Sequence, residues 1–275
     1  MTALILIRGG GDLASGVAYR LHRAGLNVII TELAQPLAVR RLVSFAEAIY
    51  AGQITVEGIT ARRVEDPTDR LRILQILAKG QIPVLIDPSA REAIKMFPLA
   101  IVDARMLKQP PEPLPHQAAL YIGLGPGFVA GENCDAVIET NRGHTLGRVY
   151  WQGKPEADTR LPEGDPRRVL RAPADGIFQA AHEIGDHCEE GETIAWVESS
   201  STHGKRYPIH SPFPGVVRGL LHPGLQVKEG MKVGDIDPRD NPRYCTLISD
   251  KSLAIGGGVL EALLTRPEVR SKLWE

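Results

Sequence analysis

The sequence predicts an α/β protein, with a Rossmann-like parallel sheet covered by helices on both faces and a small all-β domain after it. Over residues 1–158, short runs rich in Val and Ile alternate with stretches of helical spacing, which is typical of parallel strands joined by crossover helices. Beyond residue 158, short apolar runs between glycines and prolines replace the helical spacing. We therefore expect a Rossmann-like domain over 1–158, a β domain over 159–239, and a C-terminal strand and helix over 240–275 that pack back on the first domain.

The expected elements follow from these patterns in chain order. The strands of the first domain are expected at Leu4–Ile7, Asn27–Thr31, Val84–Ile86, Ala100–Val102, Leu120–Ile122 and Ala136–Ile138. Its helices are expected at Leu13–Ala24, Leu37–Tyr50, Pro67–Ala78 and Ser89–Met96. Two proline-rich stretches are expected as a stiff surface loop at Gln109–His116 and as the interdomain linker at Glu156–Arg168. Near the end we expect a strand at Cys245–Ser249 and a helical segment at Lys251–Leu264 that is interrupted by Gly256–Gly258.

The β domain contains an internal repeat. Its first copy includes Pro173, Gly176, Gly185, Glu190 and Gly191, and the same residue types recur 39 positions later. Two copies are too few for a solenoid, and they fit two halves that fold around each other into one small barrel.

This repeat resembles the barrel-sandwich hybrid of biotinyl and lipoyl domains over residues 169–237. In those families a lysine at the hairpin between the two halves carries the cofactor. Here the junction is Ser199–Arg206, where the one candidate, Lys205, is out of register. The resemblance therefore implies the scaffold without lysine-linked biotin or lipoate, and a modified Lys205 is the alternative.

The composition excludes several classes of protein. The 275 residues include 32 Lys and Arg against 33 Asp and Glu, and this net charge of −1 argues against a duplex-binding protein, which needs a basic surplus. No apolar run approaches the ~20 residues that span a bilayer, and the opening is too soon broken by glycine for a signal peptide. The three cysteines form no disulfide framework, and the histidines have no recognised metal-ligand spacing. We expect a cytoplasmic protein with no metal site and no nucleic-acid or membrane partner.

The first candidate site is a glycine-rich stretch between the first expected strand and helix. Gly9, Gly11 and Ala14 match the dinucleotide-binding fingerprint, and Glu32 ends the next strand about 20 residues later, where an acid would bind a ribose hydroxyl. Glycines let the backbone approach a phosphate, and the helix N-terminus supplies N–H groups. Asp12 argues against this hypothesis, because a carboxylate there repels pyrophosphate unless it points away. In the alternative interpretation Asp12 caps the helix and the glycines serve close packing.

A second glycine-rich loop, Gly123–Phe128, follows a later strand and precedes a polar stretch at Glu139–His144. Pro126 removes one N–H group, so this loop is a poorer phosphate cradle than the first. In open parallel sheets, ligands bind beyond the carboxyl ends of the strands. The polar residues expected at these ends are Arg8, Glu32, Asp87, Asp103, Arg105 and Glu139. Together they predict a ligand crevice, in which arginines hold an anion and acids accept hydrogen bonds or act as bases; alternatively, each of them caps a neighbouring helix.

These motifs define the predicted site. The cofactor-binding residues are Gly9, Gly10, Gly11, Asp12, Glu32, Gly123, Gly125, Gly127, Arg142 and His144. No catalytic residue is identified. The triple glycine at Gly256–Gly258 is open to two interpretations, an anion site at a helix start or a hinge.

Longer motifs are spread over the whole chain: IRGGGDLASGVAYRLHRAG, PLAVRRLVSFAEAIYAG, YIGLGPGF, VIETNRGHTLGRV, GDIDPR and ISDKSLAIGGGVLEA. They resemble the YqeB family, whose members are accessory proteins of the selenium-dependent molybdenum hydroxylase system. The resemblance implies a role in maturing or servicing xanthine-dehydrogenase-like molybdoenzymes. A looser analogy is to XdhC-type proteins, which pair a Rossmann-like domain with handling of the molybdenum cofactor.

Motifs and resemblance together predict an accessory or maturation factor for selenium-dependent molybdenum hydroxylases. It would bind NAD(P) or a molybdopterin-type dinucleotide in the α/β crevice. Its protein partner would be a molybdenum hydroxylase or the maturation machinery of that enzyme, met through the β domain. The alternatives are an NAD(P)-dependent oxidoreductase, a carrier of the lipoyl or biotinyl type, and a protein–protein adaptor.

Overall fold

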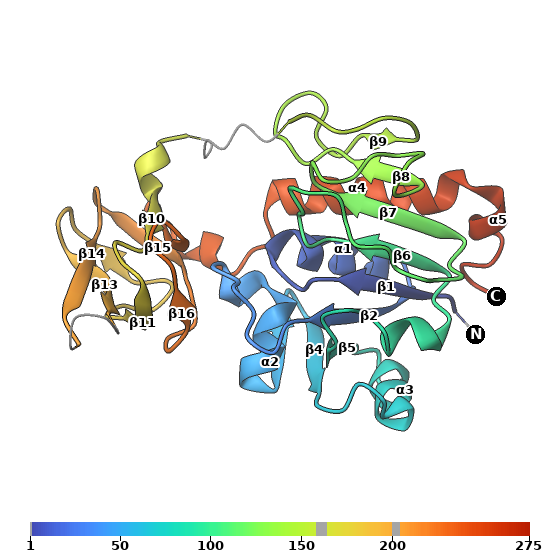
Figure 1. The fold of residues 1–275 in the computed structure, drawn as a ribbon, viewed down its shortest axis with the longest axis horizontal. Coiled ribbons are helices and arrows are strands. Elements are labelled where there is room, and N and C mark those ends of the chain that lie inside the picture. Colours follow the sequence, from blue (N-terminus) through green and yellow to red (C-terminus); the bar gives the residue numbers. More distant parts are fainter. Residues whose placement is uncertain (1, 158–163, 200–203) are drawn as a thin grey trace. The chain divides into compact units, whose positions relative to one another are not determined.

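The structure, a computed structural model, describes residues 2–157, 164–199 and 204–275. The chain divides into two units (Figure 1). The first unit comprises Met1–Pro36, Ser44–Thr159 and Ile248–Glu275, and the second comprises Leu37–Val43 and Arg160–Leu247. The predicted linker, Glu156–Arg168, lies partly outside the described residues.

A nine-stranded sheet forms the centre of the first unit, in the order β3-β4-β5-β2-β1-β6-β7-β8-β9. Its strands are β1 (Leu4–Arg8), β2 (Asn27–Glu32), β3 (Gln53–Val56), β4 (Ile59–Val64), β5 (Ile82–Ile86), β6 (Ala100–Asp103), β7 (Leu120–Leu124), β8 (Ala136–Ile138) and β9 (Val149–Tyr150). From β4 to β8 the neighbours are parallel, whereas the edge strands β3 and β9 pair antiparallel with β4 and β8. The sheet is therefore mixed, and the prediction of a Rossmann-like parallel sheet is wrong. The reason at one edge is a two-residue turn, Glu57 and Gly58, both at positive φ, which joins only antiparallel strands.

The helices of this unit are shorter than the sequence predicts in two places, and at one of them the helix expected over Ser89–Met96 is only a 3₁₀-helix at Ala93–Met96. The α-helices are α1 (Asp12–Arg23), α2 (Ala48–Ala51), α3 (Arg70–Ala78), α4 (Asp250–Thr265) and α5 (Pro267–Arg270), and the 3₁₀-helices are Phe45–Glu47 and Ala93–Met96. The helix expected over Leu37–Tyr50 is broken into 3₁₀ turns before α2, because Ser44 is extended and the N–H of Phe45 donates to the hydroxyl of Ser15 instead of a helical carbonyl.

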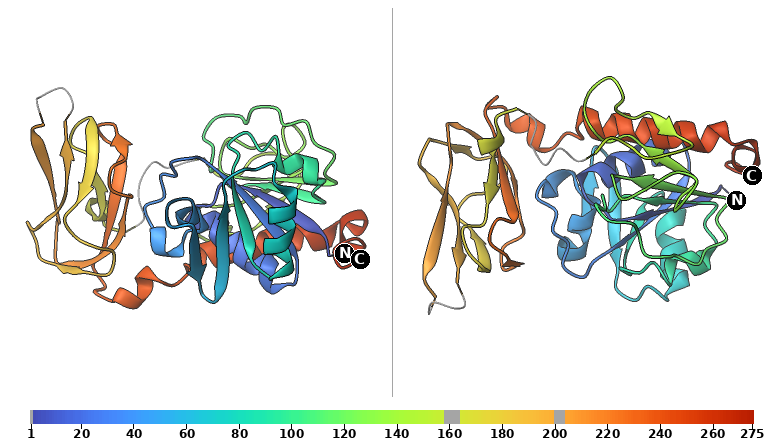
Figure 2. Two further views of the ribbon diagram at one scale, coloured as in Figure 1. Left: turned by 90° about the horizontal axis from the view of Figure 1, so that it is seen from below. Right: turned by 45° about the horizontal axis from the view of Figure 1, so that its top comes forward.

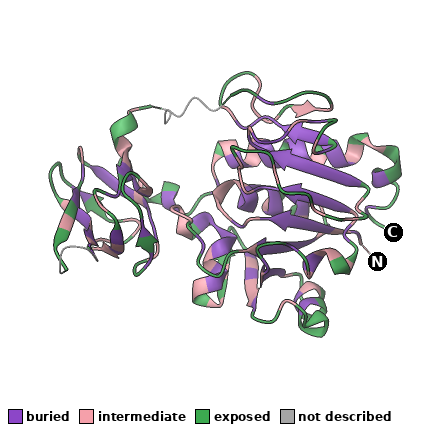
Figure 3. Ribbon diagram, viewed as in Figure 1, coloured by how far each residue is buried: buried purple, intermediate pink, exposed green. Residues whose placement is uncertain are grey.

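Both faces of the sheet are covered (Figure 2). On one face, Ile73 and Ile76 of α3 pack with Leu6, Ile101 and other strand residues in a single buried cluster. On the other face, α1 and α4 lie side by side. The central strands are buried along nearly their whole length, as the purple colouring in Figure 3 shows.

Small residues allow α1 and α4 to approach closely. A Cβ on Gly16 would lie 2.6 Å from the carbonyl oxygen of Ser252, and one on Gly256 would lie 2.7 Å from that of Gly16. Gly258 faces the backbone of Gly147 in the same way. The triple-glycine stretch thus lies inside a continuous helix, so the predicted interruption is wrong, and packing explains two of its three glycines.

The second unit contains two four-stranded antiparallel sheets, in the orders β10-β17-β15-β12 and β14-β13-β11-β16. Its elements are β10 (Val169–Arg171), β11 (Gly176–Ala180), β12 (His187–Cys188), β13 (Thr193–Glu198), β14 (Arg206–His210), β15 (Gly215–Leu220), β16 (Gln226–Val227), β17 (Lys232–Asp237) and 3₁₀-helices at Arg41–Val43, Pro166–Arg168 and Pro242–Cys245. The repeat supplies equivalent strands, since β15, β16 and β17 each begin 39 residues after β11, β12 and β13. Each copy contributes to both sheets. Because hydrogen bonding of the described residues gives two separate sheets and not one closed barrel, the predicted barrel-sandwich hybrid of the biotinyl or lipoyl type is corrected to this architecture.

Two further segments concern predictions made from the sequence, the expected strand at Cys245–Ser249 and the junction that contains Lys205. The strand expected at Cys245–Ser249 is instead the end of a 3₁₀-helix and the N-cap of α4. In the junction between the repeat copies, residues 200–203 lie outside the described residues, and Lys205 places its ammonium 4.9 Å from the ring centroid of Tyr207. Among the helices of the described ranges, none has the length and apolar character needed to cross a membrane.

Candidate functional site

The loop between β1 and α1 is the centre of the predicted nucleotide site. The N–H of Gly9 donates to the carbonyl of Thr31 (2.8 Å), and its φ of 88° favours glycine. Gly10 is confined, since a Cβ there would lie 2.9 Å from the backbone nitrogen of Ala46. A Cβ on Gly11 meets nothing within 4 Å, and Gly11 is the N-cap of α1 without a side-chain hydrogen bond. Local packing explains Gly9 and Gly10, whereas Gly11 leaves room for a ligand.

Glu32 ends β2 and holds the glycine loop in place. Its Oε2 accepts the N–H of Gly10 (2.7 Å), and its Oε1 accepts the N–H of Leu33 (2.7 Å). Burial raises the pKa of the Glu32 carboxyl above its usual value, and the two backbone donors oppose this shift. Glu32, the acid expected to bind a ribose hydroxyl, therefore holds the backbone of the glycine loop in this structure. Each of its oxygens has a second lone pair for a further donor.

The first turn of α4 joins two of the predicted site residues. The Oδ1 of Asp12 accepts a hydrogen bond from the hydroxyl of Ser252 (3.0 Å). The two Nη atoms of Arg142 each lie 2.6 Å from a carboxylate oxygen of Asp250. The Asp12 carboxylate is therefore held toward Ser252 of α4, although a neutral hydroxyl leaves its negative charge in place.

The second glycine loop is packed against neighbouring parts of the first unit. A Cβ on Gly123 would collide with the ring of Phe128. Gly125 has a φ of 108°, and the N–H of Gly127 donates to the carbonyl of Leu107 (2.8 Å). These contacts account for the three glycines without a ligand. Their role in cofactor binding stays a prediction.

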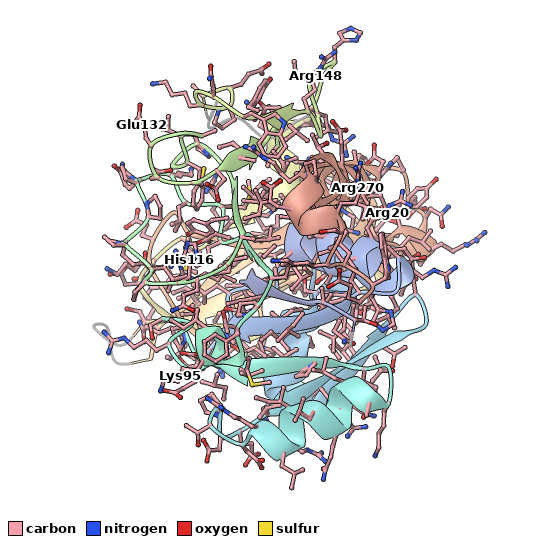
Figure 4. All side chains as sticks on the ribbon, turned by 90° about the vertical axis from the view of Figure 1, so that its right-hand side faces the viewer. Arg20, Lys95, His116, Glu132, Arg148 and Arg270 are labelled. Carbon is pink, nitrogen blue, oxygen red and sulfur yellow. The ribbon has the colours of Figure 1, made fainter. Side chains whose placement is uncertain are left out.

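Two of the acids expected in the crevice cap local backbone. The carboxylate of Asp87 accepts the N–H groups of residues 91–93, and that of Glu139 accepts N–H groups of residues 140, 141 and 156. The Asp87 contacts agree with the alternative interpretation, in which a strand-end acid caps a neighbouring helix, whereas the N–H groups bound by Glu139 belong to no helix. His144 is exposed, and its carbonyl lies 3.4 Å from the Nε of Arg148, which is labelled in Figure 4.

A charged cluster that the sequence only partly indicates lies where β1 and β6 end. Its members are Arg8, Asp103, Arg105, Glu112 and Tyr121. Arg8 and Asp103 are register partners on adjacent strands, and both are fully buried. The expected strand ends place Arg8, Asp103 and Arg105 here, but Glu112 and Tyr121 were missed. The available signal for Glu112 is its place as the one acid in the proline-rich stretch QPPEPLPH.

Tyr121 serves this cluster as a hydrogen-bond donor. Its hydroxyl donates to the Oδ2 of Asp103 (3.0 Å), and burial together with the Asp103 charge holds the pKa of Tyr121 above its usual value. The ring of His116, labelled in Figure 4, packs edge-on against the Tyr121 ring with centroids 5.2 Å apart. The phenol is therefore a fixed donor at neutral pH and not a base.

The three cysteines are buried thiols. Burial raises the pKa of Cys134 to about 12 and also raises the pKa values of Cys188 and Cys245. At neutral pH they supply no thiolate for the handling of sulfur or selenium. Within the part of the chain that the structure describes, no group of three or more His, Cys, Asp or Glu side chains is placed to hold a metal ion.

No protein-family model matches the chain. This chain is similar to YqeB of Escherichia coli strain K12. The two are 45% identical over 265 residues, which cover 95% of this chain and 47% of YqeB, so the chain spans about half the length of this curated relative. The YqeB-like character indicated by the sequence motifs is confirmed, and YqeB itself is described as uncharacterized.

Several solved structures are weakly similar to this chain. The ectoine utilization protein EutE (DoeB) of Ruegeria pomeroyi is 12% identical, with 86% of this chain and 85% of that chain covered and a TM-score of 0.28. A succinylglutamate desuccinylase/aspartoacylase of Rhodobacter sphaeroides is 12% identical over 86% and 85% of the chains, with a TM-score of 0.27. An aspartoacylase family protein of Mesorhizobium loti is 9% identical over 86% and 84%, with a TM-score of 0.28. At these TM-scores the likenesses give this chain neither a substrate nor a reaction.

These findings correct the predicted function. YqeB, the curated relative, is described as uncharacterized, so the similarity that confirms the YqeB-like character gives no support to a role in molybdenum enzymes. The maturation-factor prediction is therefore withdrawn, together with the oxidoreductase, the lipoyl or biotinyl carrier and the adaptor. The predicted ligand class and protein partner are not tested by these findings and stay predictions.

Proposed function

We infer that the first unit binds a small nucleotide-like molecule, of the NAD(P) or molybdopterin-dinucleotide type, with a phosphate at the start of α1. One observation carries this proposal: an N-terminus without a side-chain cap, at Gly11, and two arginines, Arg8 and Arg105, come together at the carboxyl end of β1. Gly9, in the loop between Arg8 and Gly11, lies next to Arg105, since a Cβ on Gly9 would be 3.4 Å from the Cγ of Arg105. Ligands of sheets with parallel central strands bind at such ends.

The start of α1 has the properties that a phosphate requires. The helix spans 12 residues, and its first N–H groups and macrodipole create positive potential at Gly11. Ala14 is buried, as expected at the position where the fingerprint packs the helix on the strand. Glu32, bonded to the loop through Gly10, could accept a ribose hydroxyl on its remaining lone pairs.

Native mass spectrometry tests this proposal. The purified chain is measured as isolated and then with NAD(H), NADP(H), CTP and a molybdopterin dinucleotide. We expect one of them to be retained by the wild type and by Gly257→Ala, whose Cβ also enters open space but on α4, and to be lost in Gly11→Val. Because Gly11 has an ordinary φ of −67°, valine there intrudes on the ligand without backbone strain. A bare polypeptide mass under all conditions would refute the proposal.

We also propose a cytoplasmic location. Three buried cysteines that remain thiols, in separate parts of the chain, support a reducing compartment. Subcellular fractionation tests this, and recovery of the chain outside the cytoplasmic fraction would contradict it.

A further inference from the structure

The cluster at the ends of β1 and β6 holds more charge than a packing role requires. We propose that Arg8 and Arg105 form a recognition site for an anionic group of the ligand, a carboxylate or a phosphate, and that Glu112 occupies this site as an internal substitute that the ligand displaces. The inference deepens the proposed function, on which it rests for the identity of the whole ligand. The anion site is independent of that proposal, because it rests on the contacts among Arg8, Arg105 and Glu112.

Arg8 is a buried cation with unused hydrogen-bonding capacity. Its side chain has no exposed surface, its Nη1 donates to the Oδ2 of Asp103 (2.9 Å), and its Nη2 donates to the Oε1 of Glu112 (2.6 Å). Among the described residues, its buried Nε has no hydrogen-bond partner. Buried donors are rarely left without an acceptor, so an unfilled one marks a place where a ligand can bind.

Arg105 contacts both acids from the partly exposed side. Its Nε and Nη2 bind the two oxygens of Asp103 (2.8 and 2.7 Å), and its Nη1 and Nη2 bind the two oxygens of Glu112 (2.7 and 3.2 Å). Arg105 thus presents a pair of N–H groups to the planar Glu112 carboxylate and Arg8 adds a third donor, and such paired guanidinium donors recognise carboxylates and phosphates. Glu112 therefore occupies the position of such a ligand group.

The charges of the cluster show why an anion is needed there. Asp103 belongs to β6 and is fully buried, so it is a permanent partner of both arginines. One buried acid leaves one positive charge uncompensated, and an unpaired buried charge is strongly unfavourable. Glu112 supplies the second negative charge in the structure, and an anionic ligand would supply it equally well.

Glu112 differs from Asp103 in how firmly the fold holds it. Its side chain is 55% exposed, and it comes from the proline-rich stretch between β6 and β7, where the structure has neither helix nor strand. It accepts charged hydrogen bonds from Arg105 and Arg8, which also lower the pKa of Glu112 to about 2, with Arg105 as the larger cause. A ligand anion can replace these bonds one for one, after which the exposed Glu112 carboxylate is hydrated by solvent.

The site is placed to act together with the glycine loop. Arg105 lies beside Gly9, and the carbonyl of Arg8 accepts the N–H of Ala104 (2.9 Å), so β1 and β6 carry the two arginines to the same edge. If a ligand binds with one phosphate at Gly11, a second acidic group of that ligand would therefore bind Arg8 and Arg105.

Isothermal titration calorimetry with two probes tests the proposal, using inorganic pyrophosphate for the phosphate arm and succinate for the carboxylate arm. Glu112→Gln keeps the shape of the side chain but removes the competing charge. We expect this variant to bind one probe about tenfold tighter than the wild type or better, and the tighter probe identifies the class of anion. Glu92→Gln is the matched control, because it removes the same charge from an exposed pair with Lys95 and should leave the affinity unchanged.

Addition of Arg105→Gln to the Glu112→Gln chain should abolish the gain. The proposal is overturned if Glu112→Gln binds neither probe more tightly, or if the gain survives the loss of Arg105. Should Glu112→Gln not fold, Glu112→Asp gives the same test with a smaller gain, because the shorter acid reaches the arginines less well. Probe binding that depends on Arg105, without any retained nucleotide, would sustain this inference and refute the proposed function. Nucleotide binding with equal affinity in the wild type and in Glu112→Gln would sustain the proposed function and refute this inference.

Discussion

The three consecutive glycines of α4 face different surroundings, so they test the packing argument for the first unit. A Cβ on Gly258 would collide with the carbonyl of Gly147, and one on Gly256 would lie 2.7 Å from the carbonyl oxygen of Gly16. A Cβ on Gly257 meets nothing within 4 Å. Alanine is favoured over glycine inside a helix by about 1 kcal/mol, so Gly257→Ala should raise the free energy of unfolding by about 0.5–1 kcal/mol.

Gly258→Ala gains the same helix propensity but must push two backbone segments apart. Overpacking of this kind costs about 1–3 kcal/mol, which is therefore the expected difference in unfolding free energy between the two variants. For a protein of this size 1 kcal/mol changes Tm by about 2–4 °C, so the two melting temperatures should differ by about 2–12 °C. Thermal melts followed by circular dichroism measure this difference, with Gly257→Ala above the wild type and Gly258→Ala below Gly257→Ala. Equal melting temperatures, or the reverse order, would refute the close approach of α4 to its neighbours.

Three further predictions concern charge and reactivity. Asp103→Asn leaves Arg8 buried without its permanent anion and should lower the free energy of unfolding by about 3–5 kcal/mol in urea titrations, and a loss below about 1 kcal/mol would contradict a buried ion pair. The pKa of Glu112 is about 2 when folded, below its usual 4.5, so its contribution to stability is complete above pH 4.5 and is lost as the pH falls toward 2. Glu112→Gln should flatten this part of the stability–pH curve, by a small amount because the carboxyl is 55% exposed, and an unchanged slope would argue against the pairing. Cys134, with a pKa of about 12, should resist iodoacetamide in the folded chain at neutral pH and react once the chain is unfolded, as followed by mass spectrometry; rapid labelling of the folded chain would show that the thiol is not buried.

The central strands of the sheet could be predicted because they are buried on both faces and form nearly continuous apolar runs. The edge strand β3 could not, since in QITV exposed polar residues alternate with half-buried or buried apolar ones and no continuous apolar run exists. Its pairing with β4 depends on a turn in which Glu57, a residue that rarely adopts positive φ, does so. The sequence pattern thus identifies the six parallel strands β5, β2, β1, β6, β7 and β8 and overlooks β3, β4 and β9, of which β4 is parallel to β5.

The candidate site shows a similar division. The glycines of both loops stand out in the sequence, but whether a glycine faces a ligand or another backbone depends on contacts between distant segments. The hydrogen bond from the N–H of Gly127 to the carbonyl of Leu107 explains the glycine at position 127. No such contact explains Gly11, where a Cβ would meet nothing within 4 Å. Glu112 meets Arg8 across 104 residues of sequence, a distance at which local patterns carry no information.

The position of α4 in the chain has a consequence for synthesis on the ribosome. Every residue of the second unit is made before α4 exists, whereas the first unit needs α4 to cover α1 at Gly16 and to bury Ile255 and Val259. We therefore expect the earliest-made segment of the first unit to wait, with an apolar face open to water, until translation passes residue 265. A nascent chain stalled before Asp250 would expose that face to chaperones and proteases, so the synthesis of α4 decides whether α1 is ever covered.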